Sequence, residues 1–213
     1  PKTKKPKTKK PIKMKTKDMQ AKFKELLLST NREGIEHVVE KLEELGFFKA
    51  PASTKFHLNC EGGLLEHSMN VCDMALELRE LLIRKKEGLC DMLPKESVII
   101  AALLHDVCKS DIYKPAVKRQ KNQHGVWCDV PGYDVDYSNF PLGHGEKSVI
   151  WLLRNGLKLT DDEIMAIRWH MTAWDLPFQS PEMKNNLNVA RDKCPLMALI
   201  QAADGLAANM LER

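Results

Sequence analysis

The apolar run Val98-Ile99-Ile100-Ala101-Ala102-Leu103-Leu104 ends in the dipeptide His105-Asp106, and this combination constrains the chain more than any other feature. Seven consecutive apolar residues of this kind predict a core helix, and the two polar residues that follow lie at its end. Histidine and aspartate are both common metal ligands. An apolar helix that ends in this pair therefore places two potential ligands at the rim of the core.

Further candidate ligands lie at helix-like positions elsewhere in the chain. Each belongs to a short motif: Leu64-Leu65-Glu66-His67, Gly143-His144-Gly145-Glu146, Ile167-Arg168-Trp169-His170 and Ala202-Ala203-Asp204. Neutral imidazoles with carboxylates suit Mn, Fe, Co, Ni or Zn. With His105 and Asp106 they make six ligands, which is enough for two divalent transition-metal ions.

The order of these ligands along the chain resembles that of the HD-domain superfamily of metal-dependent phosphohydrolases. The resemblance covers roughly residues 56 to 210. The stretch from Phe56-His57 through Gly62-Gly63-Leu64-Leu65-Glu66-His67 also looks like the start of the first ligand helix in HD-domain exoribonucleases. The resemblance implies an all-α fold, an HD-domain helical bundle, with a short irregular or hairpin insertion.

The resemblance also implies how the ligands are shared between the two ions. One ion is held by His67, His105, Asp106 and Asp204, and the second by Asp106, His144 and His170. A carboxylate shared in this way screens the repulsion between cations ~3.5–4 Å apart. A water between them would lose a proton near neutral pH, and the resulting hydroxide is the expected nucleophile that attacks phosphorus. We therefore expect hydrolysis of a phosphate ester or phosphodiester, in a nucleotide or at a nucleic-acid end.

Two residues are candidates for direct roles in catalysis, Asp106 as the shared carboxylate and Lys109 as a substrate-binding cation. In the superfamily, a lysine just after the His-Asp pair commonly contacts the substrate phosphate. The alternative for Lys109 is a solvated lysine near the negative end of a helix dipole. Arg168 lies two residues before His170, so on a helix it faces away from the site and predicts an exposed ion pair.

Weaker candidates lie beside the ligands. His37 is offset from the apolar stripe of its helix and is expected to face solvent. The others are expected to be hydrogen-bond partners of ligands, surface residues, pocket-lining residues or, for the tryptophans, core residues: Glu66, His57, His124, Trp169, Trp174 and Asp175.

Charge is distributed unevenly along the 213 residues. Residues 1–17 carry nine lysines and no acid, so a net charge of +4 for the whole chain leaves −5 for the remainder. Such a tail buries too little apolar surface to offset the entropy of ordering it. We expect residues 1–17 to be a disordered Lys-rich tail, either a solvated extension or an arm that contacts nucleic acid, and residues 18–213 to form a single domain.

Apolar periodicity predicts helices over most of that domain. They begin near Asp18 and near Ile35, the second ending at Gly46, and the later ones cover about 64–86, the run to His105, 143–155, 161–170 and 195–211. Thr160-Asp161-Asp162-Glu163 is typical of a capping box. The exception is 114–142, where Trp127–Val130 and Tyr133–Tyr137 flank Pro131-Gly132 and predict a short hairpin, either a lid or a rigid surface excursion.

Other features bear on location and on competing functions. Six cysteines without a Cys-x-x-Cys pair indicate reduced thiols in a cytoplasmic protein. No membrane span, secretory signal or oligomeric state is predicted. Three alternatives to a general phosphohydrolase remain: an exoribonuclease, an oxygenase with a diiron site similar to that of myo-inositol oxygenase, and a nucleotide-sensing module without turnover.

Overall fold

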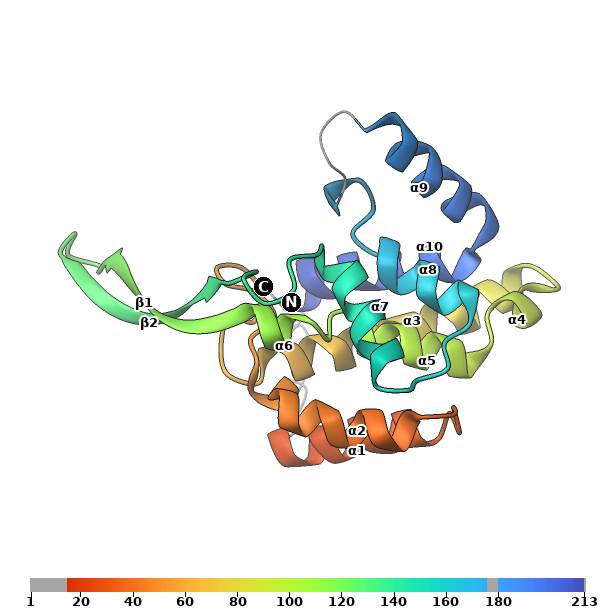
Figure 1. Cartoon of the computed structure of the whole chain (residues 1–213), viewed down its shortest axis with the longest axis horizontal. Coiled ribbons are helices and arrows are strands. Elements are labelled where there is room, and N and C mark those ends of the chain that lie inside the picture. The colour runs from red at the N-terminus through yellow and green to blue at the C-terminus, as the bar shows by residue number, and fades with distance from the viewer. Residues whose placement is uncertain (1–14, 176–179, 213) are drawn as a thin grey trace, which may run out of the picture.

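The computed structural model describes residues 15–175 and 180–212, and these residues form a mostly helical fold (Figure 1). The α-helices are α1 Thr16–Leu28, α2 Ile35–Leu45, α3 Gly63–Lys85, α4 Leu89–Met92, α5 Lys95–Leu104, α6 Lys109–Ile112, α7 His144–Arg154, α8 Asp161–Trp169, α9 Pro181–Lys193 and α10 Pro195–Leu206. Shorter helical turns are η1 Phe47–Lys49, η2 Thr172–Asp175 and the π-helical η3 Ala207–Leu211. Two strands, β1 Tyr113–Lys121 and β2 Trp127–Val135, complete the fold. The prediction of an all-α class is confirmed.

Helix α5 lies at the centre of the molecule. Every residue from Ser97 to Leu104 is buried, because a helix that is apolar on all sides has no face suited to water. Helices α1, α3, α8 and α10 pack against α5; α3 also packs against α1 and α10, and α8 against α10. The C-terminal end of the central helix is thus held on several sides, which fixes the residues that follow it.

Local signals explain why the outer helices begin and end where they do. Helix α2 buries Ile35, Val38, Val39 and Leu42 on one side and ends at Gly46, whose φ of 82° favours glycine. Helix α8 begins with the predicted capping box, in which Thr160 and Glu163 bond to each other's backbone N–H groups. The Glu163 carboxylate is fully buried and pairs with Arg32 at 2.6 Å.

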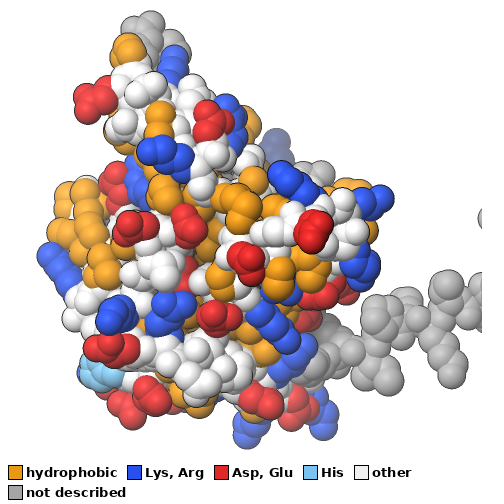
Figure 2. Space-filling view, turned by 90° about the vertical axis from the view of Figure 1, so that its right-hand side faces the viewer, with side chains coloured by type: hydrophobic (Ala, Val, Ile, Leu, Met, Phe, Trp, Pro, Cys, Tyr) orange, Lys and Arg blue, Asp and Glu red, His pale blue; other side chains and the backbone are white. Residues whose placement is uncertain are grey.

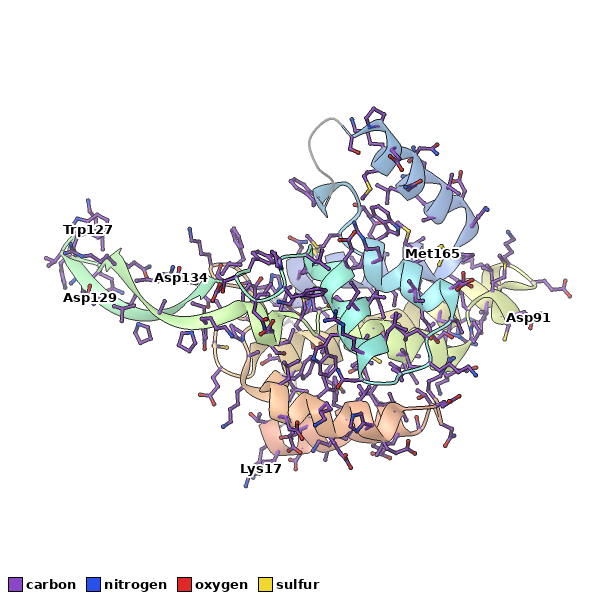
Figure 3. All side chains as sticks on the ribbon, in the orientation of Figure 1. Lys17, Asp91, Trp127, Asp129, Asp134 and Met165 are labelled. Atoms are coloured by element: carbon purple, nitrogen blue, oxygen red, sulfur yellow. The ribbon has the colours of Figure 1, made fainter. Side chains whose placement is uncertain are left out.

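The strands pair as an antiparallel ribbon that projects away from the helices (Figure 1). Trp127 and Asp129 lie near its far end and Asp134 nearer the helices (Figure 3). The sequence prediction was wrong about the turn. Pro131 and Gly132 lie within β2, opposite Val117 and Ala116, and the chain instead reverses over residues 122–126.

The composition of the ribbon accounts for this turn. The Asn122 side chain accepts hydrogen bonds from the backbone N–H groups of His124 and Val126, and Gly125 has a φ of 76°. A two-stranded ribbon has two free edges, so proline at position 131 is tolerated within it.

One helix begins earlier than predicted, and one long helix was not predicted. Helix α1 begins at Thr16 rather than Asp18, and residues 1–14 of the predicted tail lie outside the described residues. Helix α9 was not predicted, although Ser180 accepts a hydrogen bond from Met183 N–H and Pro181 occupies the first helical position. In hindsight, this Ser-Pro-Glu start is a standard helix signal.

Acidic and basic side chains are interspersed over the face shown in Figure 2. All six cysteines are free thiols, and Cys72, Cys108 and Cys194 are buried. Within the described part of the chain, no single helix has the length and apolar character needed to cross a membrane. Helices α9 and α10 with η3 meet those criteria only as a pair, and they are bent by 100° at their junction.

Candidate metal centre

All six predicted ligand residues lie on helices or directly after them. His67 is in the first turns of α3, and His144 is the first residue of α7. The other four are at or near C-terminal ends: His105 and Asp106 follow α5, His170 follows α8, and Asp204 lies in the last turn of α10. Packing of these helices around α5 brings residues from five separate segments to one place.

Asp106 is at the centre of the cluster, and its two carboxylate oxygens face different histidines. Its Oδ2 atom is 3.1 Å from His105 Nε2 and 3.5 Å from His67 Nε2. Its Oδ1 atom is 3.4 Å from His170 Nε2 and 3.7 Å from His144 Nε2. The carboxylate therefore separates four imidazoles into two pairs.

Asp204 belongs with the first pair, since its Oδ1 atom is 3.3 Å from His67 Nε2. Within the pairs, the Nε2 atoms of His67 and His105 are 3.3 Å apart, and those of His144 and His170 are 3.1 Å apart. Two overlapping groups have donor atoms close enough to hold metal ions on either side of Asp106: His67, His105 and Asp106, and Asp106, His144 and His170. Two further groups meet the same criterion, His105, His170 and Asp204, and His57, His67 and Glu212.

The orientation of the rings fits cation binding. His105 Nδ1 bonds to the carbonyl oxygen of Ala102 at 2.8 Å, and His170 Nδ1 bonds to that of Ile167 at 2.7 Å. Because these Nδ1 atoms are the donors, the Nε2 atoms of both rings face the centre. The facing Nε2 atoms of each pair are 3.1–3.3 Å apart, which is close enough for both rings of a pair to bind the same cation.

A second observation supports the same fit. The Oδ1 atom of Asp106 is buried and accepts no hydrogen bond from the described residues. A buried, unpartnered carboxylate oxygen is costly, and such an atom calls for an explanation such as an ion. The residues present therefore suit divalent cations on both sides of Asp106.

The surrounding charges shift several pKa values. Burial favours the neutral form of Asp106, but Lys109 and then His105 outweigh it and hold the pKa of this carboxyl well below its usual range. Burial likewise opposes charge on Lys109, yet the Asp106 carboxylate 2.6 Å from Nζ raises the pKa of the ammonium group. Burial, with the charge of His170, lowers the pKa of His144 to about 3, so this ring is neutral at pH 7.

Glycine at position 145 allows α7 and α8 to approach closely. A Cβ atom at this position would be 2.4 Å from the Arg168 carbonyl oxygen, which is shorter than real Cβ contacts. The residue thus brings His144, which precedes it, next to His170 at the end of α8. One side of the centre depends on this close contact.

A cavity of about 630 Å³ opens next to the cluster. Lys109, His170 and Asp204 line it on the side of the cluster, and Phe56 and Trp174 line it elsewhere. Volumes of this size are typical of small-molecule sites. Lys109 is paired with Asp106 and is not the solvated lysine of the alternative interpretation, since its side chain is only 11% exposed.

Other predicted residues are placed as follows. Arg168 forms the expected ion pair, with Glu146 at 2.8 Å, but the pair is only partly exposed, since the Arg168 side chain is 13% exposed and that of Glu146 37%. His37 and His124 are exposed, the latter in the turn of the ribbon. Trp169 is buried in the core, whereas Trp174 is 87% exposed. Glu66 is partly buried, and the side chain of Asp175 lies outside the described residues.

Sequence reasoning missed Glu212. Its Oε1 and Oε2 atoms lie 3.0 Å and 3.1 Å from His67 Nδ1, and His57 Nε2 is 3.9 Å from Oε2. Glu212 follows Asp204 by eight residues, so in a regular helix the two residues would lie near the same face. Nothing in the sequence indicates the π-helical turn between them. Among the weaker candidates whose side chains the structure describes, His57 lies beside a ligand, with its ring centroid 5.0 Å from that of His67.

Comparison with known proteins gives one partial match. A stretch of 61 residues, 29% of this chain, is 38% identical to part of the dihydroneopterin 2′,3′-cyclic phosphate phosphodiesterase of Methanocaldococcus jannaschii. The match covers 23% of the length of that protein. No family model matches the chain. No solved structure matches it significantly.

Proposed function

We propose that the protein is an HD-type phosphohydrolase that uses two divalent transition-metal ions to cleave a phosphodiester. The observation that carries the proposal is the division of four histidines between the two oxygens of Asp106. A carboxylate in this position suits a two-cation centre, because one negative charge is shared between two ions that otherwise repel each other. The partial match to a phosphodiesterase supports the reaction class.

We propose that the ligands divide between the two ions as the HD-domain resemblance implies. The first ion would be held by His67, His105, Asp204 and Oδ2 of Asp106, and the second by His144, His170 and Oδ1 of Asp106. Imidazole and carboxylate donors suit Mn, Fe, Co, Ni or Zn. When bound, such ions supply Lewis acidity, which polarises phosphoryl oxygens and lowers the pKa of water.

The protein's own residues would prepare this chemistry. The backbone carbonyls of Ala102 and Ile167 keep His105 and His170 turned toward the centre, so no reorientation is needed on binding. Lys109 lines the cavity, and its ammonium group is held in the charged form by Asp106. We propose that Lys109 contacts the substrate phosphate and stabilises negative charge on its non-bridging oxygens.

The substrate class follows from the same features. The cavity is of small-molecule size, and the partial relative is named for a 2′,3′-cyclic phosphate. We propose a nucleotide or a related phosphodiester as substrate, and cyclic phosphates are the first compounds to test. Contact between the Lys-rich tail and nucleic acid stays a separate proposal, because residues 1–14 lie outside the described residues.

A reconstitution screen tests the proposal. Metal-free protein is loaded with Mn, Co, Ni, Fe or Zn and assayed against 2′,3′- and 3′,5′-cyclic nucleotides, nucleoside mono-, di- and triphosphates and short oligoribonucleotides. We expect metal-dependent hydrolysis of at least one phosphate compound. Asp106→Ala should be inactive, and Asp192→Ala, at an exposed position on α9, should equal the wild type.

Other outcomes would contradict the proposal. Equal activity of Asp106→Ala would remove the mechanism. Turnover of a non-phosphorylated substrate that required iron and dioxygen would instead indicate an oxygenase. Tight nucleotide binding without product over long incubation would indicate a sensing module.

A further inference from the structure

Glu212 forms a well-defined contact on the outer side of the metal centre. Its side chain is 1% exposed, and both carboxylate oxygens lie within hydrogen-bond distance of His67 Nδ1, at 3.0 Å and 3.1 Å. The Asn70 amide donates a further hydrogen bond to Oε1 at 3.0 Å. A carboxylate buried to this extent, with His67 and Asn70 both directed at it, has one orientation.

The contact with Nδ1 determines what the other nitrogen of His67 can do. With the Nδ1 proton donated to Glu212, Nε2 of His67 faces Asp204 Oδ1 and His105 Nε2, each 3.3 Å away. Carboxylates in this position fix the tautomer of a metal-binding histidine and make the ligand nitrogen more basic. By contrast, the Nδ1 atoms of His105 and His170 donate hydrogen bonds to neutral backbone carbonyl oxygens.

The two sides of Asp106 therefore differ in negative charge. The side of His67 and His105 has Asp204 as a further carboxylate and Glu212 behind the ring. On the side of His144 and His170, the second oxygen of Asp106 lies near both rings and Asp204 lies near His170, but His170 Nδ1 bonds to a neutral backbone carbonyl and not to a carboxylate. Divalent ions bind more tightly where more carboxylate charge is available and where the ligands are already oriented.

A π-helical turn after α10 places the Glu212 carboxylate beside His67. After α10, the chain continues through the π-helical η3, and the Glu212 N–H bonds to the Ala207 carbonyl oxygen at 3.2 Å. Turns of this kind are rare and occur frequently at functional sites. The turn sets Glu212 against α3, which packs on η3.

We propose that Glu212 is a positioning residue that holds His67 with Nε2 directed at the centre. The metal site formed by His67, His105 and Asp204 is thereby the tighter of the two metal sites. This inference rests on the proposed function only in requiring that divalent ions bind. It adds an order of loading, in which the His67 side fills first.

Calorimetric titration of the metal-free protein with Zn²⁺ or Mn²⁺ tests the inference. The wild type should show two classes of site. Glu212→Gln should weaken the tighter class about 10- to 100-fold and leave the weaker class unchanged. Glu182→Gln, at an exposed position on α9, is the matched control and should change neither class.

A spectroscopic readout separates positioning from folding. In Zn²⁺-loaded, ¹⁵N-labelled protein, the His67 ring should give the pattern of an Nδ1–H tautomer, and its Nδ1 proton should shift upfield in Glu212→Gln because the acceptor loses its charge. Circular dichroism melting of the metal-free variants shows whether each is folded. His144→Ala provides the converse test, since it should remove the weaker class and keep the tighter one.

The possible results distinguish the two proposals. A folded Glu212→Gln protein with unchanged affinity in the tighter class would overturn the role of Glu212, as would equal weakening of both classes. A wild-type protein that binds no divalent ion would refute the metal-dependent function itself, and the inference would fall with it.

Discussion

Replacement of Gly145 by alanine should damage one side of the metal centre through sterics alone. The new Cβ atom would be 2.4 Å from the Arg168 carbonyl oxygen and 3.1 Å from that of Ile167. Real Cβ atoms are essentially never found within 3.0 Å of a heavy atom from a residue that is not their neighbour in the chain. Helices α7 and α8 must therefore separate locally by at least about 0.6 Å. The contact is with backbone, so no flexible side chain can rotate away.

The size of the effect follows from packing. Overpacking of this kind typically costs 1–3 kcal/mol, and we expect the Gly145→Ala free energy of unfolding to fall by about 2 kcal/mol. The same separation moves His144, the preceding residue, away from His170, whose Nε2 atom is 3.1 Å from that of His144. The variant should therefore bind one divalent ion with near-normal affinity and the second more weakly.

Urea unfolding of the metal-free protein and calorimetric metal titration measure the two effects. Gly205→Ala is the matched control, because a Cβ atom at that helical position meets nothing within 4 Å. It should be neutral or more stable by up to about 1 kcal/mol and should still bind two ions. The reasoning would be refuted if Gly145→Ala were as stable as the wild type and bound both ions normally.

Three further predictions concern the shared carboxylate, a buried ion pair and the thiols. Asp106→Asn should lower phosphodiester hydrolysis by on the order of 100-fold or more, measured as kcat/KM with each metal, since the amide cannot serve two cations; wild-type rates would contradict this. Arg32→Ala leaves the fully buried Glu163 carboxylate without its cation and should lower the free energy of unfolding in urea by about 3 kcal/mol. The control Arg191→Ala, at an exposed position, should lower it by under about 0.5 kcal/mol. A loss for Arg32→Ala as small as that of the control would contradict the role of this ion pair. Burial raises the pKa of Cys72 and Cys108 to about 12 and of Cys194 to about 11, so at pH 8 the native protein should react with thiol reagents at the exposed Cys60 and Cys90 well before these three. The unfolded chain releases these thiol protons near pH 9, whereas the folded state retains them. The free energy of unfolding should therefore be unaffected by these thiols below pH 9 and should fall as the pH rises from there toward 12. A free energy of unfolding that does not change over this pH range would contradict the burial of these thiols.

Much of the fold and the site was predictable because the decisive signals are local. The apolar run to Leu104 predicted a core helix, which is α5, and the residues that follow such a helix lie at the edge of the core. The capping box at Thr160 fixed the start of α8 and hence the place of His170. The HD-domain resemblance predicted that six scattered residues serve as metal ligands, and their roles as ligands stay a prediction.

What sequence reasoning missed depends on contacts between distant segments or on unusual backbone. Glu212 becomes important only because η3 turns it toward α3, and no pattern in the sequence encodes a π-helical turn. The ribbon was misplaced because Pro131-Gly132 is a common turn pair, whereas the turn at Asn122 depends on side-chain bonds to the backbone. The cytoplasmic location and the boundary of the tail stay predictions.

The most direct test of the central claim is the anomalous scattering of a crystal soaked in Mn²⁺. We expect two peaks ~3.5–4 Å apart on either side of the Asp106 carboxylate, one near His67, His105 and Asp204 and the other near His144 and His170. A single peak, or peaks away from Asp106, would contradict a shared carboxylate, and the absence of any bound ion under saturating Mn²⁺ would contradict a metal centre altogether.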